Sequence, residues 1–552
     1  MRTRWLRLVV ALMTTMVVVA GCGVDLSGEG SGGGREAQLN LQPRDNVRDG
    51  GTLTTAIPEV SAQWNSLQAD GTLYTRLLWR WYNPMLAYFA PNGDYSFNRD
   101  YFTDVRTELV RGNTRVTYTI NPRARFNDGT AIDWRAFEHT WRITRGTDHA
   151  YVISSSDGYS QIAAVTRGVN DKQAVVTFNG VWAWPNGLFN ELIHPKVNTP
   201  DLFNKAYLQN PHNEWGAGPY VVSSYDRNRG VVVFTRNPKW WGKPGKLDRR
   251  VFRQMEAQAT INAFRNGEID VAPYYSKNDR AQLITMPRID FRVAPTPQRS
   301  LLVVNLDSPL LGDIRVREAL LRGIDRKTLS RIKFAGLNYS EEPPGSLSMF
   351  AFQPGYEDNV SASITYDVGR AKALLDQAGW RTGADGIRVK NGQALTLSLP
   401  LISDAEWVAN MGRAMQSMLR SVGIDLQITV RPSSEFSSIV INKEFDVFMM
   451  GFSSGDPYGM AYLCQAWCEG SELNKAGAGS PELDAEIARV AQIADPVAQI
   501  AAGNAVERRA FAQYSDLPLY DGPLMVATKH GLANYGSGIF YVGPVEDVGW
   551  QK

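Results

Sequence analysis

Two short patterns in this sequence have the spacing of enzyme active sites. The first, Gly451-Phe452-Ser453-Ser454-Gly455, matches the G-x-S-x-G turn that presents the nucleophilic serine of α/β-hydrolases. The residues that would complete a triad in the required chain order are Asp484, Asp495 or Asp516, and His530. Against this interpretation, Asp456-Pro457 favours a turn where the elbow needs a helix, and no HGGG-like oxyanion segment precedes it. A serine hydrolase that uses Ser453 is therefore a weaker alternative.

The second pattern, Ser330-Arg331-Ile332-Lys333, matches the S-x-x-K of penicillin-binding enzymes. No K-T-G follows it, and its residues fit an ordinary amphipathic helix, so we reject the enzymatic interpretation. The sequence also has no H-E-x-x-H, no Cys/His cluster with metal-ligand spacing and no phosphate-binding loop. We therefore predict no catalytic residues, no metal and no cofactor.

The N-terminal residues indicate export from the cell. Arg2, Arg4 and Arg7 precede a short apolar run that ends in Ala20-Gly21-Cys22. A basic start, a short apolar core and small residues at its end are typical of a signal peptide, here residues 1–21. The ending resembles a bacterial lipobox, which implies lipid on the Cys22 sulfur and cleavage before this residue. Residues 22–50 are rich in Gly and charge, which predicts a flexible, lipidated tether.

The remaining cysteines, Cys464 and Cys468, lie close together in the sequence. In an exported, oxidising setting a local disulfide is the expected outcome. A metal site at this place would lack a second pair of ligands, because no His lies nearby.

Composition excludes several classes of protein. The chain has 552 residues, with 58 Lys+Arg against 56 Asp+Glu, so it lacks the basic excess of a nucleic-acid-binding protein. With 21% charged and 11% aromatic residues, its composition is that of a globular protein rather than of a disordered chain. The length predicts two to four domains.

Strand and helix patterns alternate along the folded part. Residues 116–120 alternate like a strand, and residues 132–141 have helical spacing. The clearest region is 394–452, where β-α-β-α-β order predicts a parallel sheet with strands at 395–399, 424–430 and 447–450. Ligands bind beyond the carboxyl ends of such strands, which favours the loop after residue 450.

Eight segments carry a resemblance to a known family. In order along the chain they are residues 125–130, 216–221, 236–241, 264–271, 305–326, 371–380, 418–424 and 445–447. Their sequences include RFNDGT, GAGPYV, RNPKWW and FRNGEIDV, and they occur in the family's order. They resemble the bacterial extracellular solute-binding proteins of family 5, which is the oligopeptide-, dipeptide- and nickel-binding type.

The resemblance implies an α/β, two-lobe periplasmic-binding-protein-like fold (type II, cluster C) with hinge strands and an extra subdomain in the N-terminal lobe. Lobe I would comprise residues 51–297 plus 515–552, with the inserted subdomain at about 76–198. Lobe II would comprise residues 298–514. The hinge crossovers would lie near 297–306 and 515–523, and the solute would be enclosed between the lobes.

The same resemblance implies the function of a receptor. The protein would sit on the extracytoplasmic face of the bacterial plasma membrane, anchored through lipid on Cys22. It would act as a monomer and deliver a peptide-like or other organic solute to the permease and ATPase subunits of an ABC importer, without binding nucleic acid. An alternative is a non-transport lipoprotein that uses the same scaffold to regulate cell-envelope synthesis.

The expected ligand-binding residues combine polar and aromatic side chains, namely Asp70, Arg299, Trp407, Ser453, Ser454 and Asp456. At two places this chain departs from dipeptide-binding relatives. Ser453 stands where the resemblance implies an aspartate that pairs with the peptide ammonium. Residues 401–412 contain no arginine to bind the carboxylate, and Arg413 lies one turn later, where we expect it to face solvent. We therefore expect that the solute is not a simple dipeptide held by both termini.

Overall fold

A seven-stranded mixed sheet is the centre of lobe I in this computed structural model, which describes residues 36–536 and 538–552. The sheet order is β12 (Ile289–Pro295), β21 (Pro523–Lys529), β11 (Val271–Pro273), β1 (Thr52–Ile57), β10 (Arg249–Gln254), β9 (Val231–Arg236) and β8 (Tyr220–Asp226). The strand β1 runs parallel to β10 and β11, while the outer pairs are antiparallel. Leu53 and Ile57 alternate toward the core, as period-two patterning requires. The helices of this part are α1 (Leu73–Tyr82), α3 (Pro200–Lys205), α4 (Ala257–Arg265) and α5 (Lys277–Ile284).

A separate four-stranded antiparallel sheet is inserted between β1 and β8. Its order is β4 (Phe102–Val110), β5 (Asn113–Ile120), β7 (Gln173–Phe178) and β6 (Ile162–Arg167), and α2 (Trp134–Thr144) packs on it. This confirms the strand expected at 116–120. The helix expected from residue 132 begins at Trp134, because Asp133 accepts a hydrogen bond from Arg135 N (2.9 Å) and caps it. The short hairpin β2 (Ala87–Phe89) and β3 (Tyr95–Phe97) lies before it in the chain.

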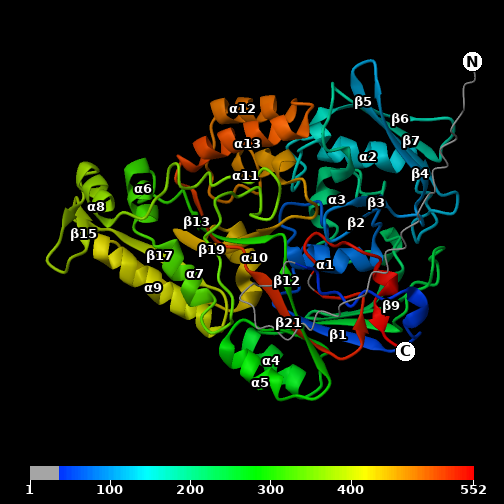
Figure 1. Ribbon diagram of the computed structural model, residues 1–552. Coiled ribbons are helices and arrows are strands. Elements are labelled where there is room, and N and C mark those ends of the chain that lie inside the picture. Colours follow the sequence, from blue (N-terminus) through cyan, green and yellow to red (C-terminus); the bar gives the residue numbers. More distant parts are fainter. Residues whose placement is uncertain (1–35, 537) are drawn as a thin grey trace, which may run out of the picture. The chain divides into compact units, whose positions relative to one another are not determined.

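Lobe II contains most of the helices and three small sheets, one of which includes the hinge strand β20 from the C-terminal segment. The sheets are β19 (Val447–Ser453), β13 (Gln298–Val304) and β20 (Asp516–Tyr520); β17 (Thr396–Leu401) and β18 (Asp425–Val430); and β14 (Arg381–Thr382), β15 (Arg388–Lys390) and β16 (Gln393–Ala394). The helices are α6 (Ile314–Arg322), α7 (Arg326–Lys333), α8 (Val368–Gln377), α9 (Glu406–Val422), α10 (Phe436–Ile441), α11 (Leu463–Trp467), α12 (Pro481–Ala491) and α13 (Pro496–Phe511). In Figure 1 the helices α6 to α9 gather beside β17, and α12 and α13 lie side by side.

The prediction of one parallel sheet over residues 394–452 is wrong in its third strand. The strands β17 and β18 are parallel neighbours, as expected. From Val447 onward, however, β19 pairs antiparallel with β13. Its start still touches β17, because the Asp446 carboxylate accepts hydrogen bonds from Ser398 N (2.7 Å) and Ser398 Oγ (2.8 Å). The strand β19 is therefore hydrogen-bonded into the sheet of the hinge strands β13 and β20 rather than into that of β17 and β18.

The chain passes between the seven-stranded and the three-stranded sheet at two places. One is the short link between β12 and β13, and the other is Asp521–Gly522 between β20 and β21. The two hinge strands β13 and β20 are antiparallel neighbours, which places the two passages close together. We keep the names lobe I (51–297 with 515–552) and lobe II (298–514); these boundaries stay a prediction.

Residues 36–50 differ from the flexible tether expected over 22–50. Leu39 and Val47 are buried, Val47 bridges to Gln551, and Arg48 N donates to Trp550 O (2.8 Å). Residues 36–50 thus pack against the C-terminal segment through Leu39, Val47 and Arg48, so this part of the predicted tether belongs to the folded body. The signal peptide, Cys22 and the rest of the tether lie outside the described residues.

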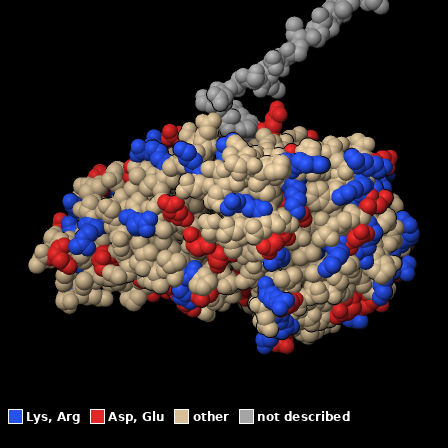
Figure 2. Space-filling view, turned by 90° about the horizontal axis from the view of Figure 1, so that it is seen from below, with Lys and Arg blue, Asp and Glu red and all other residues tan. Residues whose placement is uncertain are grey.

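Charges of both signs are intermingled over the face that Figure 2 shows. Ion pairs such as Arg167–Asp171 and Arg431–Glu444 lie at the surface. In lobe II a disulfide joins Cys464 to Cys468. No helix within the described residues has the length and apolar character to cross a membrane.

Candidate functional site

The two lobes touch through polar side chains at several points. Glu256, just after β10, accepts hydrogen bonds from Ser433 N (2.8 Å) and Ser433 Oγ (2.6 Å) in lobe II. Asp157 of the inserted subdomain accepts a bond from Gln465 N (2.9 Å). These contacts bring the carboxyl end of β10 against lobe II, which is the region where an enclosed solute would lie.

A lysine surrounded by aromatic rings lies at this junction. Lys333 Nζ is 3.4 Å from the ring centre of Trp407, 5.0 Å from that of Tyr275 and 5.6 Å from that of Tyr520. We call these four residues the lysine box. It draws one residue from each of four places: the end of α7, the first turn of α9, the loop after β11 and the end of β20. Both lobes and a hinge strand therefore build it.

Local sequence explains how Lys333 reaches this position. Asp325 caps α7 by accepting from Lys327 N (3.0 Å), which fixes where the helix begins. Leu329 and Lys333 then lie four residues apart on one helical face, and both are buried. The lysine thus takes the place of a core residue.

Burial dominates the electrostatics of the box. Lys333 is 8% exposed, and burial lowers its pKa to about 7, although Asp279 and Glu341 pull the other way. Among the described residues, Lys333 Nζ has neither a hydrogen bond nor an ion pair. The cation–π contact with Trp407 is the closest interaction of its charge.

Further polar groups beside the box lack partners. Trp407 Nε1 is buried without a hydrogen-bond acceptor in the part of the chain that the structure describes. In lobe I, Glu59 Oε2 is likewise buried and unpaired, and burial raises the pKa of this carboxyl although Ser437 lowers it. Tyr74 lies near both Glu59 and Tyr275, and these neighbours add to the burial that raises its pKa. A solute at the junction of the lobes that carries a hydrogen-bond acceptor would satisfy Trp407 Nε1.

Of the six predicted ligand-binding residues, Trp407 is the one that lies in the lysine box. Arg299 is buried at the hinge, where its guanidinium donates to both Asp521 carboxylate oxygens (2.7 and 2.8 Å) and lies over the Phe350 ring. Its donors are therefore committed to the fold. Asp70 accepts from Gln68 Nε2 (2.9 Å) and lies near Lys475 of lobe II, whose pKa it helps to raise against burial.

The serine loop after β19 forms a different part of the interface. Ser453 is the last residue of the strand, and Ser454 N donates to Pro297 O (2.8 Å) at the hinge. Asp456 is buried and accepts from Tyr462 Oη (2.7 Å), and burial raises its pKa to about 6 while Arg76 of α1 lowers it. These side chains are half-buried or internally paired, and whether they touch the solute stays a prediction. Arg413 is exposed, as expected.

The structure does not assemble a serine triad. No helix follows Ser453 directly, as a nucleophile elbow requires. His530 pairs with Asp290 (2.9 Å) at an edge of the seven-stranded sheet, and no hydrogen bond joins it to Ser453 in the described chain. The candidate acids are engaged elsewhere, Asp484 with Glu469 N, Asp495 as the cap of α13 and Asp516 with Ser515.

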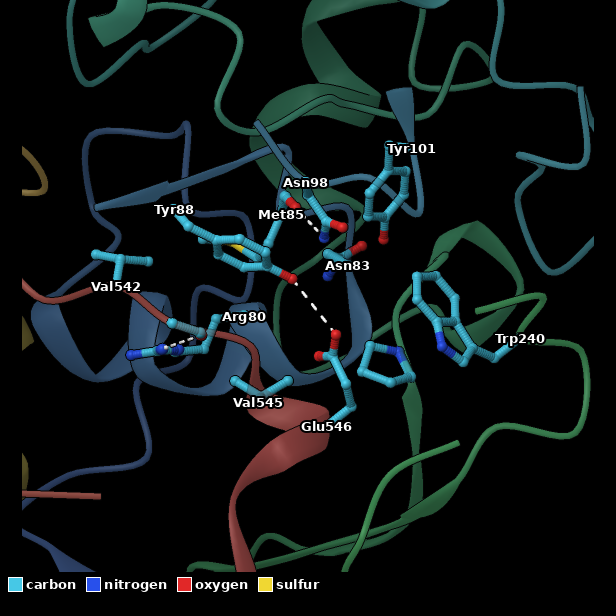
Figure 3. A pocket seen from close by; sticks show the side chains of 12 residues that line it. Arg80, Asn83, Met85, Tyr88, Asn98, Tyr101, Trp240, Val542, Val545 and Glu546 are labelled. Carbon is cyan, nitrogen blue, oxygen red and sulfur yellow. Dashed lines mark hydrogen bonds between the residues drawn. The ribbon is translucent and has the colours of Figure 1, made fainter. Parts of the chain in front are cut away.

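Two cavities outside the lysine box are less suited to a solute. The first, shown in Figure 3, is lined by Arg80, Tyr88 and Glu546 among others, with Tyr88 Oη donating to Glu546 Oε1 (3.4 Å). Its volume of about 10 Å³ suits a single water molecule. The second is an open surface groove of about 580 Å³ on the inserted subdomain, beside Trp134 and Arg167. No group of three or more His, Cys, Asp or Glu residues in the described ranges is arranged to hold a metal.

Two lobes linked by paired hinge strands, with a polar site at their junction, define the fold of a periplasmic solute-binding protein. Residues 105–472 match the profile described as bacterial extracellular solute-binding proteins, family 5 Middle. The chain belongs to this family, which confirms the resemblance and the fold class inferred from the sequence.

Three comparisons describe its relatives. The chain is 33% identical over 541 residues to the oligopeptide-binding protein OppA of Mycobacterium tuberculosis, covering 96% of this chain and 90% of OppA. It is 28% identical over 270 residues to the probable monoacyl phosphatidylinositol tetramannoside-binding protein LpqW of the same species, covering 48% of this chain and 41% of LpqW. The solved oligopeptide-binding protein AppA of Bacillus subtilis, in complex with a nonapeptide, has a TM-score of 0.76 at 17% identity, covering 92% of this chain and all of that one (100%).

Sequence reasoning missed Lys333, Tyr275, Tyr520 and Glu59 as site residues. Lys333 belongs to the S-x-x-K pattern, whose residues fit an ordinary amphipathic helix. One signal was present, because a lysine four residues after Leu329 falls on the apolar face of the helix. The aromatic partners carry no local signal, since they come from distant parts of the chain.

Proposed function

We propose that the protein is an extracytoplasmic receptor that binds a peptide-like or other organic solute at the lysine box and delivers it to an ABC importer. The observation that carries this proposal is a buried polar site with unpaired groups, built by both lobes and a hinge strand. The similarity to OppA along nearly the whole chain supports a peptide-like solute. A ligand that contacts both lobes favours the closed form, which a permease can recognise.

The proposal also covers the transporter subunits, the oligomeric state and the lack of catalysis. The permease and ATPase would be separate subunits, and the receptor would act as a monomer without catalytic activity. The relatives are binding proteins by name, which supports binding rather than catalysis.

The decisive experiment is mass spectrometry of the solute that co-purifies with the protein from its native host. We expect one class of peptide-like compound in the wild type, and loss of its uptake in a strain that lacks the protein. A protein that purifies without solute and binds none, in a host whose uptake is unchanged by the deletion, would contradict the proposal.

Lipid anchoring gives a testable prediction. Replacing Cys22→Ser removes the sulfur that would carry the lipid, so we expect most of the protein to move from the membrane fraction to the culture medium or periplasm. The reason is that membrane affinity would come from buried acyl chains rather than from charge. Cell fractionation with immunoblotting measures this, and Cys464→Ser together with Cys468→Ser is the control that keeps Cys22. Unchanged membrane association of Cys22→Ser would contradict the anchor.

A second candidate function is supported by the similarity to LpqW, whose name describes binding of a phosphatidylinositol tetramannoside. In this alternative the protein is a non-transport lipoprotein that regulates cell-envelope synthesis through protein contacts. Deletion would then change envelope glycolipids while peptide uptake stays normal. The uptake experiment above therefore separates the two functions.

A further inference from the structure

Two acidic side chains of lobe I accept hydrogen bonds from backbone N–H groups of lobe II. Glu256 binds Ser433 with both carboxylate oxygens, at 2.8 Å from Ser433 N and 2.6 Å from Ser433 Oγ. Asp157 Oδ2 accepts from Gln465 N at 2.9 Å. We call Glu256 and Asp157 the closure acids. Hydrogen bonds to an ionised acceptor are about twice as strong as those between neutral groups, so each contact helps to hold the lobes together.

The segments of lobe II that donate these bonds have no capping side chain of their own. Pro432 precedes the turn Ser433–Glu435, which leads into α10, and Tyr462 precedes α11; neither residue forms a side-chain capping bond. The first N–H groups of a helical segment need an acceptor, which is normally a side chain just before it. Here the acceptor comes from the other lobe, so these N–H groups lose it when the lobes separate.

Lobe I itself makes little use of the two carboxylates. Glu256 stands at the capping position of α4, but its side chain forms no capping bond there. Asp157 accepts one bond within its own loop, from Ser155 Oγ at 3.1 Å. Both side chains therefore act across the junction of the lobes, and we expect lobe I to keep its fold when they are removed.

Further contacts join the inserted subdomain to the same part of lobe II. Tyr462 Oη donates to Gly187 O (3.3 Å), and the rings of Trp184 and Tyr458 lie 5.3 Å apart. Ala461 of lobe II is buried in the hydrophobic core cluster of the inserted subdomain. The subdomain therefore meets lobe II through apolar contacts as well as through its closure acid.

The disulfide of lobe II lies in the segment that Asp157 contacts. It joins Cys464, in the first turn of α11, to Cys468 directly after this helix. A covalent link over so short a segment restricts its backbone, so Gln465 N keeps its position whether or not the lobes meet. The donor is thus preorganised for an acceptor from the other lobe.

We propose that Glu256 and Asp157 are positioning residues for closure, which stabilise the closed arrangement of the lobes and raise the affinity for every solute without contacting it. The inserted subdomain thereby supplies one of the two points at which the protein closes. The proposal rests on the proposed function, because closure matters for a protein that encloses a solute. Affinity falls in proportion to the fraction of molecules in the binding-competent form, whichever solute binds. A residue that contacts the solute instead changes the ranking of different solutes.

The test compares the wild type with Glu256→Ala, Asp157→Ala and the double variant. The matched controls are Glu108→Ala and Glu268→Ala, because each removes an exposed acid whose arginine partner also lies in lobe I. The probes are two pools of random pentapeptides, one with a free C-terminal carboxylate and one with a C-terminal amide. Retention of each pool by the purified protein over a range of concentrations gives an apparent affinity, and thermal midpoints without peptide verify folding.

A second measurement follows the lobes directly. Spin labels are attached at Val169→Cys in the inserted subdomain and at Val497→Cys in α13, and the distance between them is recorded with and without peptide. Both side chains are well exposed, at 80% and 76%, so the labels should not disturb the packing. The protein without the two added cysteines gives the background signal.

We expect each single variant to shift the ratio of closed to open molecules about tenfold toward the open form. Retention of both pools should weaken by a similar factor, while the preference between the pools stays that of the wild type and the controls behave like the wild type. The double variant should weaken both pools further. The result expected from a residue that binds the solute is different, because the loss would then fall on one pool.

A loss confined to one pool, or distances and affinities that do not change in the folded variants, would overturn the inference while leaving the receptor function standing. Retention of neither pool by the wild type would contradict the peptide-like function. The label distances without peptide then decide the inference separately: a shift toward the open form in the variants supports it, and equal distances in wild type and variants overturn it.

Discussion

Replacing Asp521→Ala is expected to lower the free energy of unfolding by about 3–5 kcal/mol. The Arg299 side chain is 1% exposed, and both of its bonds to the Asp521 carboxylate are short, at 2.7 and 2.8 Å. Removing the acid leaves a buried guanidinium without its counter-charge, which cannot shed its proton as a lysine can. Asp521 also lies where the chain passes between the lobes, so the substitution removes an ion pair at the hinge.

Denaturant unfolding followed by intrinsic fluorescence measures this effect. The matched control is Glu342→Ala, which removes an acid whose partner Lys327 is also exposed, and we expect a change within about 1 kcal/mol. The double variant Arg299→Met with Asp521→Leu should be more stable than Asp521→Ala, because it leaves no unpaired charge. If Asp521→Ala unfolds like Glu342→Ala, the buried pair does not stabilise the hinge.

This result also bears on the predicted role of Arg299. The sequence pointed to a charged group near a hinge strand, and the structure shows a structural ion pair there. If the double variant folds and still binds the solute that co-purifies with the wild type, Arg299 does not bind the solute. A loss of retention in that folded variant would restore Arg299 as a ligand-binding residue.

Local sequence signals determine the ends of several elements. Asp367 caps α8 through Arg370 N (2.8 Å), and Gly423 ends α9 with a φ of 94°, a conformation that glycine adopts without strain. Both signals lie within a few residues of the feature that they determine. The pairing of β19 failed because its partner β13 lies far away in the sequence, and a local β-α-β-α-β order cannot represent such a competitor.

The candidate site was predicted less well for a related reason. Family resemblance directed attention to the loop of Ser453 and Asp456, which the structure holds by contacts within lobe II and at the hinge. The lysine box joins Tyr275, Lys333 and Tyr520 from distant parts of the chain. We recognise it as a candidate site because Lys333 forms no salt bridge within the described residues. The sequence alone cannot show that Lys333 lacks a salt bridge, because this depends on where the fold places the acidic side chains.

Affinity for acid-terminated peptides is expected to fall as the pH rises above 7. In the unliganded protein burial lowers the pKa of Lys333 to about 7, so above this pH the free site is largely neutral. A bound carboxylate raises that pKa, so binding then requires uptake of a proton, and affinity falls by up to about tenfold per pH unit. Below pH 7 the lysine is already charged and the peptide carboxylate stays ionised, so this contribution levels off.

The binding of pentapeptides with a free C-terminal carboxylate, measured between pH 6 and 9, gives this slope, with Lys333→Met as the reference. The groups that face Lys333 are Asp279 on α5, Glu341 after α7, Tyr275 after β11, Trp407 on α9 and Tyr520 on β20. Lys333→Met keeps all of them, so a slope present in the wild type and absent from the variant belongs to Lys333. Isothermal titration in buffers of different ionisation enthalpy should show proton uptake at pH 8 by the wild type alone. A wild-type affinity that does not change from pH 7 to 9 would mean that the carboxylate binds elsewhere. A lysine that is neutral at this pH has to take up a proton before it can pair with an anion.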